Sequence, residues 1–323
     1  MLQATGSHAW AVSGGWVAAG RALHVLGTAF RPRARWGAED VDDDDGLADF
    51  LACAGPDRVL LLLGFDWHSQ MLHRSERWRS LWRGTRARRV LYVQESISNA
   101  GRLTGTNAMA QAFQSAASLC DGIVFTDVAD RPLIEAAGRP SLWQPFGADA
   151  NLFRPVVPYE ERVAGAFFRG KTEAFAHDAE YSDRRRILDH LLRRDLVTFI
   201  PYAPKPVKPS ALARDFNRYQ LAVNLPSVFG SHPTRVLEGL ACGCCVLTNR
   251  TGVPALDALF REGVELVYYR DELDLAEAIA RLRRDPAQGR VIAASGRSAV
   301  LERFALPRLL QQILAWSDDL ARR

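Results

Sequence analysis

Short apolar runs that favour β-strands alternate with helical stretches along nearly the whole sequence of 323 residues. This alternation is typical of parallel sheets covered by helices, and it occurs in both halves of the chain. The expected strands of the first half are Ala9–Ser13, His24–Thr28, Arg58–Leu63, Val90–Gln94, Gly122–Thr126 and Ser141–Gln144. Those of the second half are Ala164–Phe168, Val197–Ile200, Leu221–Asn224, Cys245–Thr248 and Leu266–Tyr269. Helices are expected over Met109–Leu119, Arg131–Ala137, Ser182–Arg193, Pro209–Arg218, Pro233–Ala241 and Glu272–Arg284. We therefore predict an α/β fold with two Rossmann-like domains.

A segment containing proline and glycine, residues 145–155, separates the two sets of strands. Such a composition indicates a turn-rich connector, and the chain is longer than most single domains. We predict an N-terminal domain over residues 1–146 and a C-terminal domain over residues 147–305. The final stretch, 306–323, has an apolar helical pattern and needs a surface to pack on. We expect it to form a helix that packs across both domains and returns to the first.

Composition limits the class of protein. The longest apolar run, Val59 to Phe65, is only long enough for a strand, so no membrane-spanning helix is expected. The N-terminus does not resemble a signal peptide, which predicts a cytoplasmic protein, with peripheral contact at the inner face of the membrane as an option. The five cysteines do not space like a disulfide framework. Cys242, Cys244 and Cys245 are interpreted as small buried residues, and no metal site is expected.

The formal net charge of +4 is mild and gives no reason to expect a nucleic-acid partner, but the positive charge is uneven. Arginines crowd the segment from Arg74 to Arg89, where Met71, Trp78 and Trp82 recur at helical spacing. The pattern favours an amphipathic helix that packs by its aromatic face and keeps its arginines in water. The alternative is a site for an anionic membrane surface or a phosphorylated acceptor.

The loop after the expected strand Leu221–Asn224 leads into the clearest helix start of the sequence. Ser231 or His232 can cap the helix, and Pro233 suits its first turn. A helix N-terminus at the carboxyl end of a strand in a parallel sheet favours a bound phosphate.

Glu238 lies one turn after Thr234 and Arg235 and falls on the same helix face as Thr234, about 6 Å along the axis. That is about the reach from a diphosphate to the ribose hydroxyls, and a carboxylate can accept hydrogen bonds from two adjacent hydroxyls. The alternative is an exposed helical glutamate balanced by Arg235.

The run from His232 to Thr248 resembles the donor-site signature of group 1 glycosyltransferases with the GT-B fold. Its Arg-x-x-Glu form is similar to that of the CgeB-like spore-maturation enzymes, and the connector at 145–155 resembles the segment that joins the two domains in this family. The likeness covers roughly residues 143–285. It implies transfer of a sugar from a nucleotide to an acceptor, with Glu238 on the ribose and Thr234 and Arg235 near the diphosphate. Retaining members often have a glutamate where this chain has Gly230, so the stereochemical outcome stays open.

A second loop, Arg169-Gly170-Lys171, follows the first strand of the C-terminal half. A glycine between two cations lets the backbone approach a diphosphate while the side chains neutralise it. Ordinary surface cations at a turn are the alternative, and Arg185 or Arg186 could serve instead. The predicted donor-binding residues are Arg169, Gly170, Lys171, Ser231, His232, Thr234, Arg235 and Glu238.

The first half is expected to bind the acceptor, which the sequence leaves open as a glycan, small molecule, lipid-linked molecule or protein. Asp66 and His68 follow the strand Arg58–Leu63, and Glu95 follows Val90–Gln94. These three are the candidate catalytic residues, since an inverting transfer needs a base to remove the acceptor proton. No cofactor is expected, and cations would stabilise the departing diphosphate without a metal. The alternatives are a nucleotide-sugar epimerase and a non-catalytic protein that binds through the basic segment.

Overall fold

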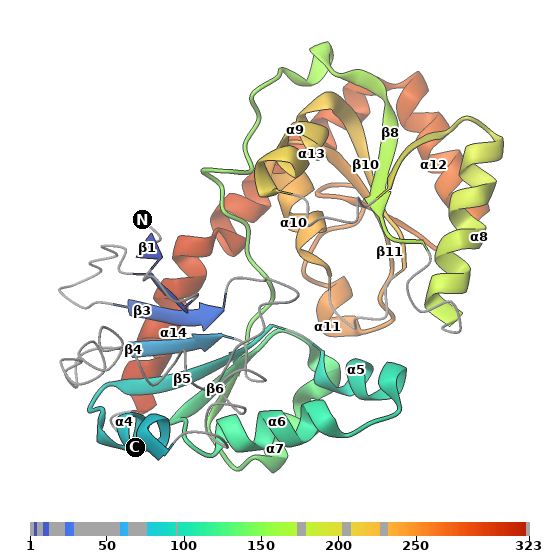
Figure 1. Ribbon diagram of the computed structural model, residues 1–323. Helices are drawn as coiled ribbons and strands as arrows, with labels where there is room; N and C mark the ends of the chain where they lie inside the picture. The colour runs from blue at the N-terminus through green and yellow to red at the C-terminus, as the bar shows by residue number, and fades with distance from the viewer. Residues whose placement is uncertain are drawn as a thin grey trace. The chain divides into compact units, whose positions relative to one another are not determined.

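The computed structural model describes residues 3–4, 9–12, 23–28, 59–63, 76–94, 96–172, 179–201, 208–226 and 232–320. The chain divides into two units, one made of residues 1–144 with 310–323 and the other of residues 145–309. Each expected strand and helix is present, with bounds that differ from the expected ones by at most three residues (Figure 1). The two units are described separately below.

The first unit contains a seven-stranded sheet whose spatial order follows the chain order. Its strands are β1 (Gln3–Ala4), β2 (Ala9–Val12), β3 (Leu23–Thr28), β4 (Val59–Leu63), β5 (Arg88–Val93), β6 (Gly122–Phe125) and β7 (Ser141–Trp143). The strands from β3 onward run parallel, whereas β1, β2 and β3 pair antiparallel. A parallel connection needs a dozen or more residues, and only residues 13–22 separate β2 from β3. The expected parallel sheet is thus present from β3 onward, and β1 and β2 add an antiparallel edge to it.

Helices cover both faces of the parallel part of this sheet. Alternate residues along β5 point to opposite faces, and Leu91 and Val93 pack with Trp82 and Phe113 in one apolar cluster. The helices of this unit are α4 (Glu76–Gly84), α5 (Ile97–Thr104), α6 (Ala108–Ala117), α7 (Arg131–Ala136) and the unit's part of α14 (Leu306–Leu320). On the other face, Ile313 and Leu314 of α14 pack against the central strands. The end of the chain thus returns to the first sheet.

The second unit is a five-stranded parallel sheet with the order β12-β11-β10-β8-β9. Its strands are β8 (Val163–Gly170), β9 (Val197–Pro201), β10 (Tyr219–Asn224), β11 (Cys245–Asn249) and β12 (Val267–Tyr269). Its helices are α8 (Ala179–Arg193), α9 (Pro209–Arg218), α10 (Thr234–Ala241), α11 (Pro254–Asp257), α12 (Glu272–Arg284) and α13 (Pro286–Ala299). The strand order reverses between β8 and β10. In open parallel sheets, ligands bind at the carboxyl ends of the strands at such a reversal.

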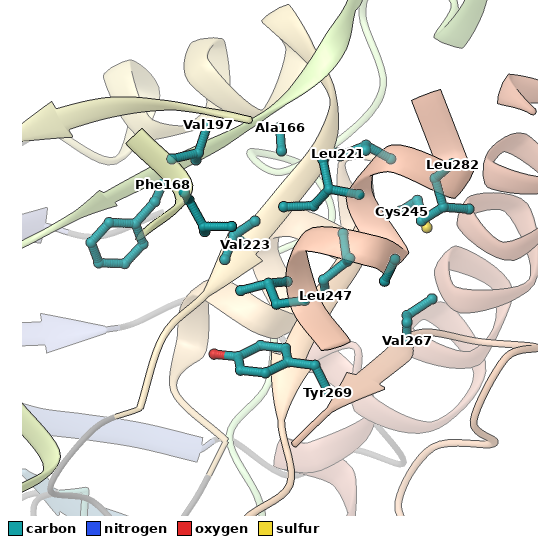
Figure 2. Packing of buried hydrophobic residues seen from close by; sticks show 14 of the residues in the cluster. Ala166, Phe168, Val197, Leu221, Val223, Cys245, Leu247, Val267, Tyr269 and Leu282 are labelled. Atoms are coloured by element: carbon teal, nitrogen blue, oxygen red, sulfur yellow. The ribbon is translucent and has the colours of Figure 1, made fainter. Parts of the chain in front are cut away.

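Alternating residues of the central strands form the two cores of the second unit. Phe168 and Leu221 pack toward α8, α12 and α13 in the cluster shown in Figure 2. Phe167 and Ala222 are the neighbours of Phe168 and Leu221 along their strands. They face the opposite side of the sheet and pack with residues of α9 and α10. Both faces of β8 and β10 are therefore covered, which leaves their carboxyl ends as the edge where a ligand can reach the backbone.

Four arginines in the described part of the basic segment pair with acidic residues of the same chain. Trp82 is 2% exposed, which confirms the expected packing of the amphipathic helix by its aromatic face. Arg79 and Arg83 pair with Glu76, Arg88 with Asp318, and Arg89 with Asp121. Met71 and Arg74, and the side chains of Arg77 and Trp78, lie outside the described residues.

Three further findings concern composition. Cys242, Cys244 and Cys245 are buried free thiols, as expected. Within the described ranges, no three His, Cys, Asp or Glu side chains group as metal ligands. Within the same ranges, no helix has both the length and the apolar character needed to cross a membrane. The cytoplasmic location stays a prediction.

Candidate functional site

Helix α10 starts at the carboxyl edge of the second sheet, shortly after β10, where the strand order reverses. Its N-cap is Pro233, which makes no side-chain hydrogen bond to the first turn. The cap position falls on Pro233, which has no side-chain acceptor, so the prediction that His232 caps this helix is wrong. Ser231, the other predicted cap, lies outside the described residues. A helix start without a side-chain cap keeps its N–H groups and partial positive charge available to an anion.

Glu238 lies one turn into α10, and its Oε2 atom is buried without a hydrogen-bond partner among the described residues. Burial raises the pKa of this carboxyl to about 7, while Arg235 and a hydrogen bond with Thr234 act in the opposite direction. A buried acceptor that finds no donor destabilises a fold by about 1–3 kcal/mol. The side chain is therefore not the exposed glutamate of the alternative interpretation, and it offers an unused acceptor beside the helix start.

Arg235 is held in place by the end of β8. Its Nη1 atom donates to the carbonyl oxygen of Arg169 at 2.9 Å. The guanidinium of Arg169 in turn lies 3.0 Å from Oδ2 of Asp215 on α9. Because Asp215 neutralises Arg169, Arg235 is the arginine of these two that is more available to an anion. Asn224 of β10 lines the same small cavity as the two arginines.

The loop after β8 also contains Gly170 and Lys171. A Cβ atom at Gly170 would lie 2.4 Å from the Phe168 ring, so the packing of that ring already explains the glycine. The side chain of Lys171 is exposed. Of the three residues predicted here, Lys171 is the one whose side chain faces solvent.

Arg184 is a residue of this edge that the sequence reasoning missed. It is 4% exposed and donates to the carbonyl oxygens of Lys171 at 3.0 Å and Pro226 at 2.8 Å. One guanidinium thus ties the loop after β8 to the loop after β10. Its sequence signal is its spacing from Ile187 and Leu188, which are buried on the same face of α8. The suggested substitute Arg186 instead pairs with Asp183 and Glu272.

Asn224, at the end of β10, was also missed. It is 3% exposed, its Nδ2 atom donates to Oγ1 of Thr248 at 2.9 Å, and its Oδ1 atom has no partner among the described residues. A buried amide oxygen at the strand reversal is a second unused acceptor. Polar residues at the end of an otherwise apolar strand are the signal that could have found it.

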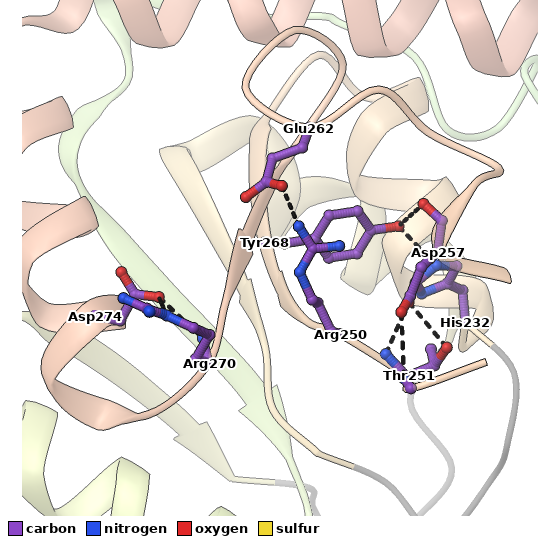
Figure 3. Close-up of polar contacts among 9 residues, drawn as sticks. His232, Arg250, Thr251, Asp257, Glu262, Tyr268, Arg270 and Asp274 are labelled. Carbon is purple, nitrogen blue, oxygen red and sulfur yellow. Dashed lines mark hydrogen bonds and ion pairs between the residues drawn. The ribbon is translucent and has the colours of Figure 1, made fainter. Parts of the chain in front are cut away.

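His232 occupies a different position from the one predicted. Figure 3 shows its ring near Asp257 of α11 and Tyr268 of β12; Nε2 lies 3.2 Å from the Tyr268 hydroxyl and 3.3 Å from the carbonyl oxygen of Leu256. Burial lowers the pKa of the imidazole. Asp257 accepts hydrogen bonds from the backbone and hydroxyl of Thr251 in the same figure. The His232 side chain thus packs against α11 and β12.

The remaining predicted residues lie outside the described part of the chain. They are Ser231, which precedes α10 in the sequence, and Asp66, His68 and Glu95 in the first half of the chain; Gly230 lies outside the described part as well. Their roles stay predictions.

Residues 184–315 match the family described as "Glycosyl transferase-like". The match includes α10 with Arg235 and Glu238, and it covers most of the second unit. No curated protein matches the sequence.

Solved structures with the same fold cover most of the chain. Sucrose-phosphate synthase from Thermosynechococcus elongatus is 16% identical over 82% of this chain and 74% of its own, with a TM-score of 0.54. The HepE protein of Anabaena, solved in complex with UDP-glucose, is 14% identical over 81% and 78%, with a TM-score of 0.53. A UDP-forming α,α-trehalose-phosphate synthase from Burkholderia vietnamiensis is 13% identical over 90% and 79%, with a TM-score of 0.54. These likenesses identify the fold.

The fold and the family match agree with each other. The chain has the GT-B fold, with two α/β units, and its residues 184–315, most of them in the second unit, are glycosyl transferase-like.

Proposed function

We propose that the chain transfers a sugar from a nucleotide-sugar to an acceptor, and that the second unit binds the donor. The observation that carries this proposal is the buried, unpartnered Oε2 of Glu238 one turn into α10, beside Arg235. A carboxylate of this kind accepts hydrogen bonds from the two hydroxyls of a ribose, and the helix start before it attracts the diphosphate.

Arg235 and Lys171 supply the positive charge that a departing diphosphate requires, in a site that needs no bound metal. Arg169 contributes through its carbonyl oxygen, which positions Arg235. UDP-glucose, the ligand in one HepE structure, is a donor of the proposed class. The Arg-x-x-Glu spacing of Arg235 and Glu238 supports a donor site of the CgeB-like variant.

The acceptor and the catalytic base belong to residues 1–146 in this proposal, and the donor domain to residues 147–305. Asp66, His68 and Glu95 follow strands of a parallel sheet, which is where an acceptor hydroxyl would be oriented or deprotonated. Neither alternative gains a specific observation. Arg79, Arg83, Arg88 and Arg89 of the basic segment pair with acids of the same chain.

The test is the release of free nucleotide from UDP-, GDP- and dTDP-sugars, measured with the full chain and with Glu238→Gln. We expect one donor to be hydrolysed slowly without acceptor, and the rate at subsaturating donor to fall at least tenfold in the variant. As a matched control, Glu277→Gln changes an exposed glutamate of α12 and should leave the rate unchanged. The proposal fails if no donor binds, or if Glu238→Gln behaves like the control.

A further inference from the structure

A cavity of about 450 Å³ lies at the opposite edge of the second sheet from Glu238. Arg162 immediately precedes β8, and Gly243 lies between α10 and the start of β11, so both lining residues mark the amino ends of the strands. Helix α10, of eight residues, spans about 12 Å and separates this edge from the donor side. Figure 1 labels α13, which contains Arg290 and Arg297 of the lining, and β8, which begins after Arg162.

Positive charge exceeds negative charge around the cavity. Arg162 is 5% exposed and donates to the carbonyl oxygens of Val157 at 2.9 Å and Cys242 at 2.9 Å. None of its hydrogen bonds among the described residues goes to a carboxylate. Arg290 pairs with Glu160 at 2.8 Å, and Arg297 has no ion pair among the described residues. Three guanidinium groups therefore face one carboxylate, which leaves a net charge of about +2.

Two buried polar atoms of the lining also lack partners. Nε of Arg297 has no hydrogen-bond partner among the described residues. The same holds for the hydroxyl of Tyr159, which is 9% exposed. Buried donors without partners are rare in folded proteins, and a bound ion or water can supply the missing partner. Their presence beside uncompensated arginines indicates an anionic ligand.

The rest of the lining is apolar. Pro155 and Pro158 lie on the connector side, and Ala293 and Ala294 on α13. Val156, on the connector side, is 66% exposed, the highest fraction among the large apolar side chains of the described residues. A cavity of this volume is within the range of small-molecule sites, which combine apolar walls with a few charged groups.

We infer that this cavity is a binding site for a phosphate monoester with a small organic body. A monoester carries a charge of about −1.5 to −2 at neutral pH, which matches the surplus of the lining, and guanidinium groups bind its oxygens in pairs. A monocarboxylate carries only one charge and leaves part of the surplus uncompensated. The organic body covers the apolar wall. This inference does not depend on the proposed transferase activity.

The experiment is a calorimetric titration of the full chain with phenyl phosphate, and separately with benzoate, at constant ionic strength. Arg290→Gln and Arg297→Gln remove one lining charge each. The Arg290 side chain is 60% exposed, so its variant keeps the fold even if Arg297→Gln does not. Arg193→Gln removes an exposed charge of α8 as a matched control, and Arg235→Gln tests whether the probe binds at the donor side instead.

We expect saturable binding of phenyl phosphate, at least tenfold tighter than that of benzoate. Binding should weaken at least tenfold in Arg290→Gln and Arg297→Gln and stay within twofold of the unmodified chain in Arg193→Gln and Arg235→Gln. Binding that survives Arg290→Gln, or that is lost in Arg235→Gln, overturns the inference. So does benzoate binding as tight as that of phenyl phosphate, or no saturable binding at all.

Discussion

Replacing Glu238 by glutamine should change how the free energy of unfolding depends on pH. Burial raises the pKa of this carboxyl from its ordinary value of 4.5 to about 7 in the folded chain. The unfolded state therefore loses its proton first as pH rises, and ionisation of Glu238 disfavours the folded state. Its contribution to stability is fully present below pH 4.5 and is lost as pH rises toward 7. A difference of about 2.5 pKa units corresponds to about 3 kcal/mol.

Glutamine cannot ionise, so the variant should not show this loss. We expect the unmodified chain to lose about 2–3 kcal/mol more than Glu238→Gln between pH 5 and pH 8, measured by urea denaturation at both values. Other titrating groups are common to both proteins and cancel in the difference. Glu277→Gln, which alters an exposed glutamate of α12, should follow the unmodified chain. The reasoning is refuted if Glu238→Gln and Glu277→Gln show the same dependence on pH.

Three further outcomes are expected. Affinity for a nucleotide-sugar, whose diphosphate diester keeps its charge between pH 6 and pH 8, should be about tenfold weaker at pH 6 than at pH 8, because only about one tenth of Glu238 is then ionised. Arg162→Met should lower the free energy of unfolding by about 3 kcal/mol, since it leaves several carbonyl oxygens without their donor, and an unchanged urea midpoint would contradict this. Gly296→Ala should cost about 1–3 kcal/mol in the same assay, because the new Cβ would lie 2.2 Å from the Glu265 carbonyl oxygen. Gly84→Ala, with nothing within 4 Å, should cost nothing.

The second sheet could be predicted from the sequence because its determinants are local. Apolar strand runs such as Leu221–Asn224 and the helix start at Pro233 leave periodic and turn signals that act over a few residues. Glu238 was found by the same local reasoning, since its spacing from Thr234 is a property of one helix. The antiparallel pairing of β2 with β3 was not predicted, because the direction in which two strands pair depends on contacts between them and not on the local pattern of either.

Roles that depend on tertiary contacts were not accessible to this reasoning. Arg184 donates hydrogen bonds to two loops that are distant in sequence. Asn224 has a buried amide oxygen without a partner among the described residues, at the point where the strand order reverses. The ring of His232 packs beside Tyr268, so its position in the helix-start signature did not reveal its surroundings. The ion pairs of the arginines were equally hard to predict. Arg169 pairs with Asp215 of α9, and α8 and β9 separate the two residues along the chain.

The central claim, that Glu238 binds the ribose of the donor, is tested most directly by a thermodynamic cycle. Calorimetry would compare the nucleoside diphosphate that binds most tightly with its 2′,3′-dideoxy analogue, each with the unmodified chain and with Glu238→Met. Hydrogen bonds to a charged group contribute about 1.5–3 kcal/mol, so removal of the hydroxyls should weaken binding to the unmodified chain at least tenfold and leave Glu238→Met within about twofold. Equal losses in both proteins would contradict the assignment, because the hydroxyls would then be recognised elsewhere.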